Sequence, residues 1–146
     1  MTSAYPTYIY KILPSDARPP SPLPQALPVS DLDKRDGFIH CSTSKQLLGT
    51  LNAFFSNESH VFILRIRYEK VAPSVKWENA AGKQPDDVGG SWDTEGKAGS
   101  TLTFFPHIYN GLQVGREEVD DMGEWRRGDD GWSGEGWCWG EVDRPV

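Results

Sequence analysis

Proline and glycine do most to limit how this chain can fold. Six of the eleven prolines lie between residues 14 and 28, and proline fixes φ and lacks a backbone donor, so this stretch cannot be a helix. We expect an extended surface segment there. Residues 80–101 contain five glycines and few apolar side chains. That loop is longer than compact domains usually carry, so we expect it to be mobile or functional.

The stretches between these breaks favour strands. Residues 8–13 and 61–68 are rich in β-branched and aromatic side chains, which is typical of β-structure. The first half of 61–68 is apolar on both faces, so we expect it at the centre of a sheet, with Arg65 and Arg67 on the face opposite Leu64.

Shorter strands are expected at 37–41, 75–78 and 104–112. Pro106 places its end of the last strand at an edge or a bulge, because a proline cannot donate to a neighbouring strand.

One window has a helical pattern. Thr43 and Gln46 suit a capping box, and apolar residues then recur with helical spacing, so we expect a helix at about 44–56. Strands outnumber helices, which predicts an α+β fold with a small antiparallel sheet core and one main helix.

Composition sets the outer limits. A chain of 146 residues is most simply a single domain, 1–146. Its tail, 115–146, has seven glycines and four of the six tryptophans. So many large aromatics argue against disorder, although the pattern assigns no structure to the tail.

Charge and cysteine content narrow the class of partner. The net charge of −6 argues against general nucleic-acid binding, and no apolar stretch approaches the length of a membrane span. Two cysteines are too few for a disulfide framework, and no signal pattern opens the chain, so we expect a soluble cytoplasmic protein. The oligomeric state stays open.

The segment Asp36–Ser44 concentrates reactive groups. His40 ends a short apolar strand, and Ser42, Thr43 and Ser44 follow where a helix should begin. His40 suits a general base or a donor to a ligand, or else a buried histidine satisfied by Asp36 or a backbone carbonyl. One hydroxyl caps the helix, and the others have room to hold an anion with the free N–H groups of the first turn. Cys41 points away from His40 by strand alternation, which weakens a Cys–His nucleophile and favours a core position.

A second histidine has similar surroundings. His107 follows Pro106, and Tyr109 lies on the same strand face, so the phenol is placed either to stack on a ligand or to fill the core. Glu78 is the natural carboxylate partner. Beside Trp77 its pKa would be raised if it were desolvated, although an exposed strand-end carboxylate is slightly favoured.

Two further kinds of site have weaker support. Arg65 with Arg67 suits a phosphate clamp, although a strand face paired with acidic neighbours is the commoner arrangement. Zinc would need a third ligand such as Glu78 beside the two histidines, and no metal-binding spacing is present, so we expect no metal.

Three blocks of this sequence carry a family resemblance. Asp33-x-x-Asp36-Gly-Phe-Ile-His40-x-Ser42-Thr43, Lys76-Trp77-Glu78 and Phe105-Pro106-His107-Ile-Tyr109 resemble, in order, the signature blocks of the domain-of-unknown-function 952 family. The resemblance runs over about 8–112. It implies a split-sheet fold similar to that of ADP-ribosyltransferases, in which a cleft holds nicotinamide adenine dinucleotide (NAD).

The chain departs from active transferases of that fold. They combine a His or Arg on the first strand with a late catalytic glutamate, whereas the first strand here carries Tyr8, Tyr10 and Lys11. The late strand offers His107 and Tyr109 in place of the glutamate. The resemblance therefore implies a nucleotide-sized cleft without the standard transferase chemistry.

These observations lead to one main hypothesis and two alternatives. The main one is a small cleft enzyme, a transferase or hydrolase, acting on an NAD-like nucleotide or another polar small molecule. NAD is the possible cofactor. The alternatives are a non-catalytic binding module whose Trp132, Trp137 and Trp139 contact a partner, and a specialised biosynthetic enzyme on the same scaffold. The expected catalytic residues are His40, His107 and Glu78. The expected ligand-binding residues are Ser42, Thr43, Tyr109, Asp36, Trp77 and Arg65.

Overall fold

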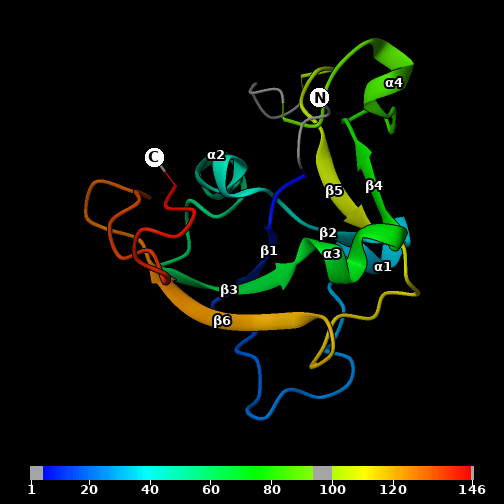
Figure 1. The fold of residues 1–146 in the computed structure, drawn as a ribbon. Helices are drawn as coiled ribbons and strands as arrows, with labels where there is room; N and C mark the ends of the chain where they lie inside the picture. The colour runs from blue at the N-terminus through cyan, green and yellow to red at the C-terminus, as the bar shows by residue number, and fades with distance from the viewer. Residues whose placement is uncertain (1–4, 94–99, 146) are drawn as a thin grey trace.

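Two three-stranded antiparallel sheets form the framework of the protein (Figure 1). The computed structural model describes residues 5–93 and 100–145. The first sheet has the order β1-β3-β6, and the second has the order β2-β5-β4. The α+β class expected from the sequence is confirmed.

The first sheet contains the long strands, β1 (Tyr8–Pro14), β3 (His60–Arg67) and β6 (Val119–Arg126). β3 lies in the centre, as its apolar first half predicts, and it pairs with β1 from Tyr8↔Arg67 to Pro14↔Val61. β6 lies in the tail, 115–146, to which the sequence pattern assigned no structure. Its acidic residues and its glycine are untypical of a strand, so the local sequence does not indicate one. Asp120 and Asp121 are exposed, whereas Trp125 is buried in the core.

The second sheet is built from short strands, β2 (Ile39–His40), β4 (Val75–Glu78) and β5 (Phe105–Ile108). β5 is the central strand, but β2 pairs only with its residues His107 and Ile108, so on the β2 side the end of β5 that carries Pro106 is an edge, as expected. A proline is tolerated at this position because β2 ends before it, so no neighbouring strand requires the N–H that Pro106 lacks. Cys41 donates to the Pro106 carbonyl at 3.1 Å, and the chain then leaves to pair with β1 at Ser42.

The main helix, α2 (Ser44–Phe54), confirms the helical pattern. Gln46 fixes its start, since its Oε1 accepts from Thr43 N–H and its Nε2 donates to the Phe104 carbonyl. The other helices are short and were not predicted individually. They are α1 (Asp31–Asp36), α3 (Tyr68–Val71), the 3₁₀ turn Ala72–Ser74 and α4 (Pro85–Val88).

α1 forms in a charged segment with little helical periodicity. The Ser30 hydroxyl accepts from the Asp33 N–H at 3.1 Å, and Gly37 ends the helix at φ 79°. A residue with a β-carbon is strained at that φ, whereas glycine adopts it freely. The cap and the glycine therefore fix where Asp33 and Asp36 lie.

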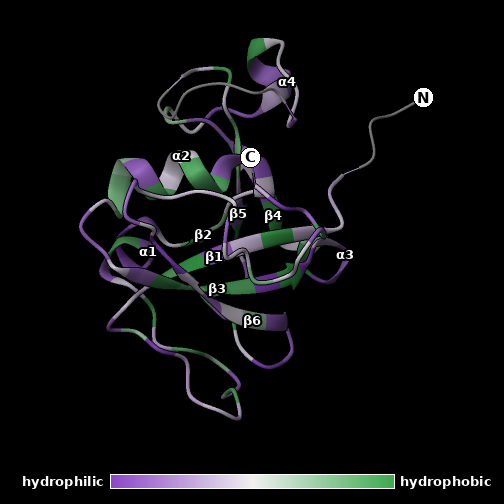
Figure 2. Ribbon diagram, turned by 90° about the vertical axis from the view of Figure 1, so that its left-hand side faces the viewer, coloured by the Kyte–Doolittle hydropathy of each residue, from purple (hydrophilic) through white to green (hydrophobic). Residues whose placement is uncertain are grey.

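Two hydrophobic clusters cover the two faces of the first sheet. On one face α2 and the tail tryptophans pack against β1 and β3, and on the other the inner face of the second sheet does so. Hydrophobic residues accordingly concentrate in β1 and β3, with β6 more hydrophilic (Figure 2). Trp132 and Trp137 are 8% and 6% exposed, so these two side chains belong to the core.

The loop 80–101 is partly ordered by Asn79. The side chain of this buried residue accepts from the backbone of Ala81 and Lys83 and donates to the Thr101 carbonyl. Residues 94–99 of that loop lie outside the described residues. Among the helices described, none is long and apolar enough to cross a membrane.

Candidate active site

The outer face of the second sheet brings the two histidines together. His40 on β2 pairs directly with His107 on β5, so both side chains leave the same face of the sheet. Their ring centroids are 5.1 Å apart, with the planes at 62°. The two segments that looked alike in the sequence therefore meet.

Glu78 holds His107 in place from the neighbouring strand. Its Oε1 lies 2.9 Å from His107 Nδ1 and accepts the Tyr109 hydroxyl at 2.6 Å. The side chains of His107 and Glu78 are only 11% and 12% exposed. Glu78 is thus a sheltered carboxylate, and the slightly favoured expectation of an exposed one is wrong.

His40 is held by two carboxylates from α1. Its Nδ1 lies 2.6 Å from Asp33 Oδ1, and its Nε2 lies 3.1 Å from Asp36 Oδ2. Asp33 is buried, and it also accepts from the His40 backbone N–H at 3.2 Å and from Lys11 Nζ at 2.8 Å. The Lys11–Asp33–His40 chain therefore links the first sheet to the second.

Phe38 covers the histidine pair. Its ring stacks on His107 with centroids 4.2 Å apart, and it lies 4.5 Å from the His40 ring and 4.9 Å from the Tyr109 ring. Lys76, opposite His107 on β4, places its ammonium 4.6 Å from the centre of the Tyr109 ring. The site is therefore an aromatic and imidazole platform edged by carboxylates and one ammonium group.

Burial and charge set the ionisation of the platform. Burial lowers the pKa of His107 and outweighs the Glu78 hydrogen bond, which acts in the opposite direction. Burial also raises the pKa of Tyr109, reinforced by its bond to Glu78. At Asp33 burial alone would raise the pKa, but the His40 and Lys11 hydrogen bonds hold it below its usual value. His107 is therefore neutral near pH 7, and Asp33 is ionised.

A family model described as "Protein of unknown function (DUF952)" matches residues 22–122. The matched region includes every histidine and carboxylate of the platform. This chain belongs to the DUF952 family.

The chain is also similar to solved structures. The chain is similar to the crystal structure of protein CC0527 from Caulobacter crescentus, with 25% identity, a TM-score of 0.58, and coverage of 86% of this chain and 91% of that one. The solution NMR structure of CC0527 gives 26% identity and a TM-score of 0.54, covering 86% and 90%. No curated protein matches.

Several residues expected at the site of this DUF952 protein lie elsewhere. Arg65 is on the first sheet, where it pairs with Asp120 at 2.7 Å and lies over the Tyr8 ring. Trp77 points from β4 into the core, away from Glu78, and its indole N–H donates to Tyr68. The structure therefore places neither side chain beside the histidines.

Ser42 and Thr43, which were expected to bind a ligand, have structural roles. Ser42 is buried and its backbone exchanges two hydrogen bonds with Tyr10, while Thr43 is the N-cap residue directly before α2. Cys41 is in the core, as expected, and burial raises the pKa of its thiol to about 12. A thiol so buried and so weakly acidic is a poor nucleophile.

Four contributors to the platform were not among the residues expected at the site. Phe38 and Asp33 lie in the first of the three family-like sequence blocks, Lys76 lies in the second, and Lys11 is on the first strand. The sequence signal for Asp33 is its spacing, since Asp33 and Asp36 are one helical turn apart and so share a helix face. In the part of the chain that is described, no group of three or more His, Cys, Asp or Glu side chains is arranged to hold a metal ion.

Proposed function

We propose that this protein is an enzyme that transfers protons to and from a polar small molecule through His107 and His40. One observation carries the proposal. Two histidine–carboxylate pairs from separate parts of the chain converge, with ring centroids 5.1 Å apart, on one face of the sheet. A core histidine needs a single partner, whereas this arrangement orients two imidazoles toward each other.

His107 is the general base. Glu78 accepts the Nδ1–H, which fixes the tautomer that leaves the Nε2 lone pair free to take a proton. No described residue hydrogen-bonds to that Nε2. The lowered pKa of His107 keeps the ring neutral near pH 7, the form that a base requires.

His40 is the acid. A carboxylate faces each of its ring nitrogens, so an N–H at either position has an acceptor. Asp33 is buried and fixed by Lys11, whereas Asp36 is on the solvent side and yields its place to a substrate oxygen. The carboxylate–histidine pair then resembles the orienting part of a catalytic triad, with Asp33 as the orienting residue.

The substrate class comes from the resemblance to ADP-ribosyltransferases, and we propose a nucleotide such as NAD. The chemistry differs from that of transferases. On β1, Lys11 is bound to Asp33 and the Tyr10 hydroxyl donates to Asp143, so neither is free to replace the missing His or Arg. The proposed reaction therefore depends on the histidines.

Ligand-induced stabilisation tests the proposal. The wild type and the variants His40→Ala, His107→Ala and His60→Ala are heated with NAD, ADP-ribose and AMP, and NAD consumption is followed in parallel. A ligand that binds the folded state alone raises the melting temperature with concentration. We expect NAD to raise the melting temperature of the wild type, and we expect a smaller rise in His40→Ala and His107→Ala, together with the loss of any turnover.

His60 provides the matched control. It is the third histidine of the chain, partly exposed, and its contacts are with Ser59 and Phe62. The His60→Ala variant should respond like the wild type. If no nucleotide shifts the wild type, the substrate class is wrong, and if His40→Ala and His107→Ala turn over substrate at the wild-type rate, the catalytic roles are wrong.

A further inference from the structure

Four aromatic rings gather on the other side of β4, away from the histidines. Tyr5 stacks on Tyr68 at 5.2 Å, on Trp92 at 5.7 Å and on Trp77 at 6.0 Å, with interplanar angles of 24°, 29° and 22°. Trp77 and Trp92 also contact each other at 5.1 Å. We refer to Tyr5, Tyr68, Trp77 and Trp92 as the aromatic cluster.

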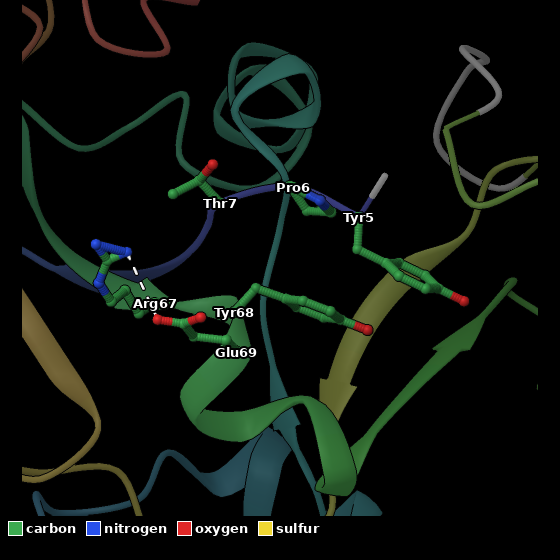
Figure 3. Close-up of a pocket in the computed structure, with 6 residues that line it drawn as sticks. All are labelled: Tyr5, Pro6, Thr7, Arg67, Tyr68 and Glu69. Carbon is green, nitrogen blue, oxygen red and sulfur yellow. Dashed lines mark ion pairs between the residues drawn. The ribbon is translucent and has the colours of Figure 1, made fainter. Parts of the chain in front are cut away.

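Two hollows lie beside this cluster, and Tyr5 lines both of them. One hollow of about 270 Å³ lies between the segment Tyr5–Thr7 and the segment Arg67–Glu69 (Figure 3). Another of about 230 Å³ is lined by Trp77, Trp92 and Asp86. In Figure 3 the Tyr5 ring extends to the same side as that of Tyr68.

Tyr5 is weakly held compared with its neighbours. It is 54% exposed, whereas Tyr68 and Trp77 are 9% and 5% exposed. Tyr68 and Trp77 are therefore fixed in the core, Trp92 is partly buried against it, and the Tyr5 ring lies on the exposed side of the cluster. Displacing the Tyr5 side chain would expose the faces of the rings on which it stacks.

The cluster also contains a donor without an acceptor. The Trp92 indole Nε1 is buried, and no described residue accepts its hydrogen. Buried N–H groups are nearly always paired, so this one indicates an acceptor supplied from outside the described chain. Trp92 lines the smaller hollow, where such an acceptor would enter.

We propose that the aromatic cluster binds a planar heteroaromatic ring that takes the place of the Tyr5 side chain and accepts a hydrogen bond from Trp92 Nε1. The near-parallel stacking of Tyr5 on three rings shows that the space suits a flat ring. A quaternary ammonium group also favours aromatic faces, but it has no acceptor for the indole. Glu69, the acidic residue of the larger hollow, already has Arg67 at 3.8 Å.

This site is separate from the histidine platform. Trp77 and Glu78 are neighbours on β4, and their side chains serve opposite faces of the sheet. The aromatic cluster therefore stands or fails independently of the acid–base proposal.

Indole NMR tests the site directly. ¹⁵N-labelled protein is titrated with adenine, a neutral flat ring with acceptors, and in parallel with tetramethylammonium and with cyclohexanol. We expect adenine to shift the Trp92 Nε1–H resonance downfield in a saturable way. Removing the competing ring in Tyr5→Ala should tighten the adenine Kd about threefold or more. Trp92→Phe, which keeps a ring and loses the donor, should weaken it about fivefold.

Trp139→Phe is the matched control, because its indole already donates to Asp121 at 2.8 Å outside the cluster. It should bind adenine like the wild type. The proposal is overturned if adenine leaves the Trp92 resonance unmoved in both the wild type and Tyr5→Ala, or if Trp139→Phe loses as much affinity as Trp92→Phe. It is also overturned if tetramethylammonium or cyclohexanol shifts that resonance as strongly as adenine. Weaker binding by Tyr5→Ala would show that Tyr5 is a wall of the site and contradict the displacement.

Discussion

The two sheets differ in what their side chains do. The first sheet is long-stranded, and both of its faces are closed by packing, with Trp125, Leu64 and Ile63 at most 1% exposed. The second is short-stranded, and its outer face holds imidazole, carboxylate, phenol and ammonium groups. Burial of apolar surface thus concentrates on one sheet, and the candidate chemistry on the other. Because the second sheet uses its inner face for the core, its outer face is available for polar groups.

The largest test removes the centre of the first sheet's packing. Trp125 is fully buried and contacts Trp132 and Trp137 edge-on, so Trp125→Ala should lower the free energy of unfolding by about 4 kcal/mol. Urea denaturation measures the loss. Ligand binding per folded molecule should be unchanged. A loss below about 1 kcal/mol would show that the tail adds little to the first sheet. It would contradict the statement that burial of apolar surface concentrates on that sheet.

The strongly patterned parts of the fold could be predicted from the sequence. The β-branched run of β3 and the helical spacing of α2 are local signals, and both elements form where expected. β6 was missed because Asp120, Asp121 and Gly123 are unfavourable in strands, and pairing with β3 overrides that preference. A local pattern cannot reveal an edge strand that is held mainly by its neighbour.

The candidate site was only partly predictable, because local sequence signals show single residues and not how they meet. Each histidine was visible as an imidazole at a short strand, but the register His40↔His107 is a tertiary fact. The role of Asp33 depends on α1, a six-residue charged helix without periodicity. Arg65, which was expected to bind a ligand, pairs with Asp120 of β6, the acidic pairing that is the commoner arrangement for a strand face.

The second test addresses the connection between the sheets. Asp33→Asn leaves Lys11, whose side chain is 12% exposed, without its buried anion, and breaking such a pair typically costs about 3 kcal/mol. Unlike Trp125→Ala, this variant should also change the His40 ring, which is visible as a shift of its imidazole NMR resonances. A variant that lost stability with the His40 resonances unmoved would mean that Asp33 serves the first sheet alone.

As the pH falls, protonation of His107 on the second sheet should lower the free energy of unfolding first. The pKa of His107 is lowered in the folded state, so between that value and the unfolded value of about 6.5 the unfolded chain binds more protons. The stabilisation is complete above about pH 6.5 and is lost as the pH falls through the folded pKa, with a slope of at most about 1.4 kcal/mol per pH unit. Asp33 adds a similar loss at lower pH, because its folded pKa lies below the unfolded value of about 3.9.

Urea titrations from pH 7.5 to pH 5 measure this slope. His107→Gln should flatten it relative to the wild type. The groups that face His107 are Glu78, His40, Asp36, Tyr109 and Lys76. A slope equally steep in His107→Gln would assign the titration to one of these groups.

The smallest test separates the hydrogen bond of Glu78 with Tyr109 from its hydrogen bond with His107. Tyr109→Phe removes the hydroxyl that donates to Glu78 Oε1 and keeps the ring beneath Phe38, so the unfolding free energy should fall by only about 1 kcal/mol. With one donor lost, the carboxylate interacts more strongly with His107. Its hydrogen bond favours the protonated imidazole, so the pKa of His107 should rise. NMR titration of the imidazole measures that change, and Tyr10→Phe, whose hydroxyl donates to Asp143 beside the first sheet, is the control. A rise in Tyr109→Phe alone would show that the chemistry of the second sheet can be tuned with little effect on the fold, whereas an equal rise in Tyr10→Phe would mean that the two sheets are electrostatically coupled.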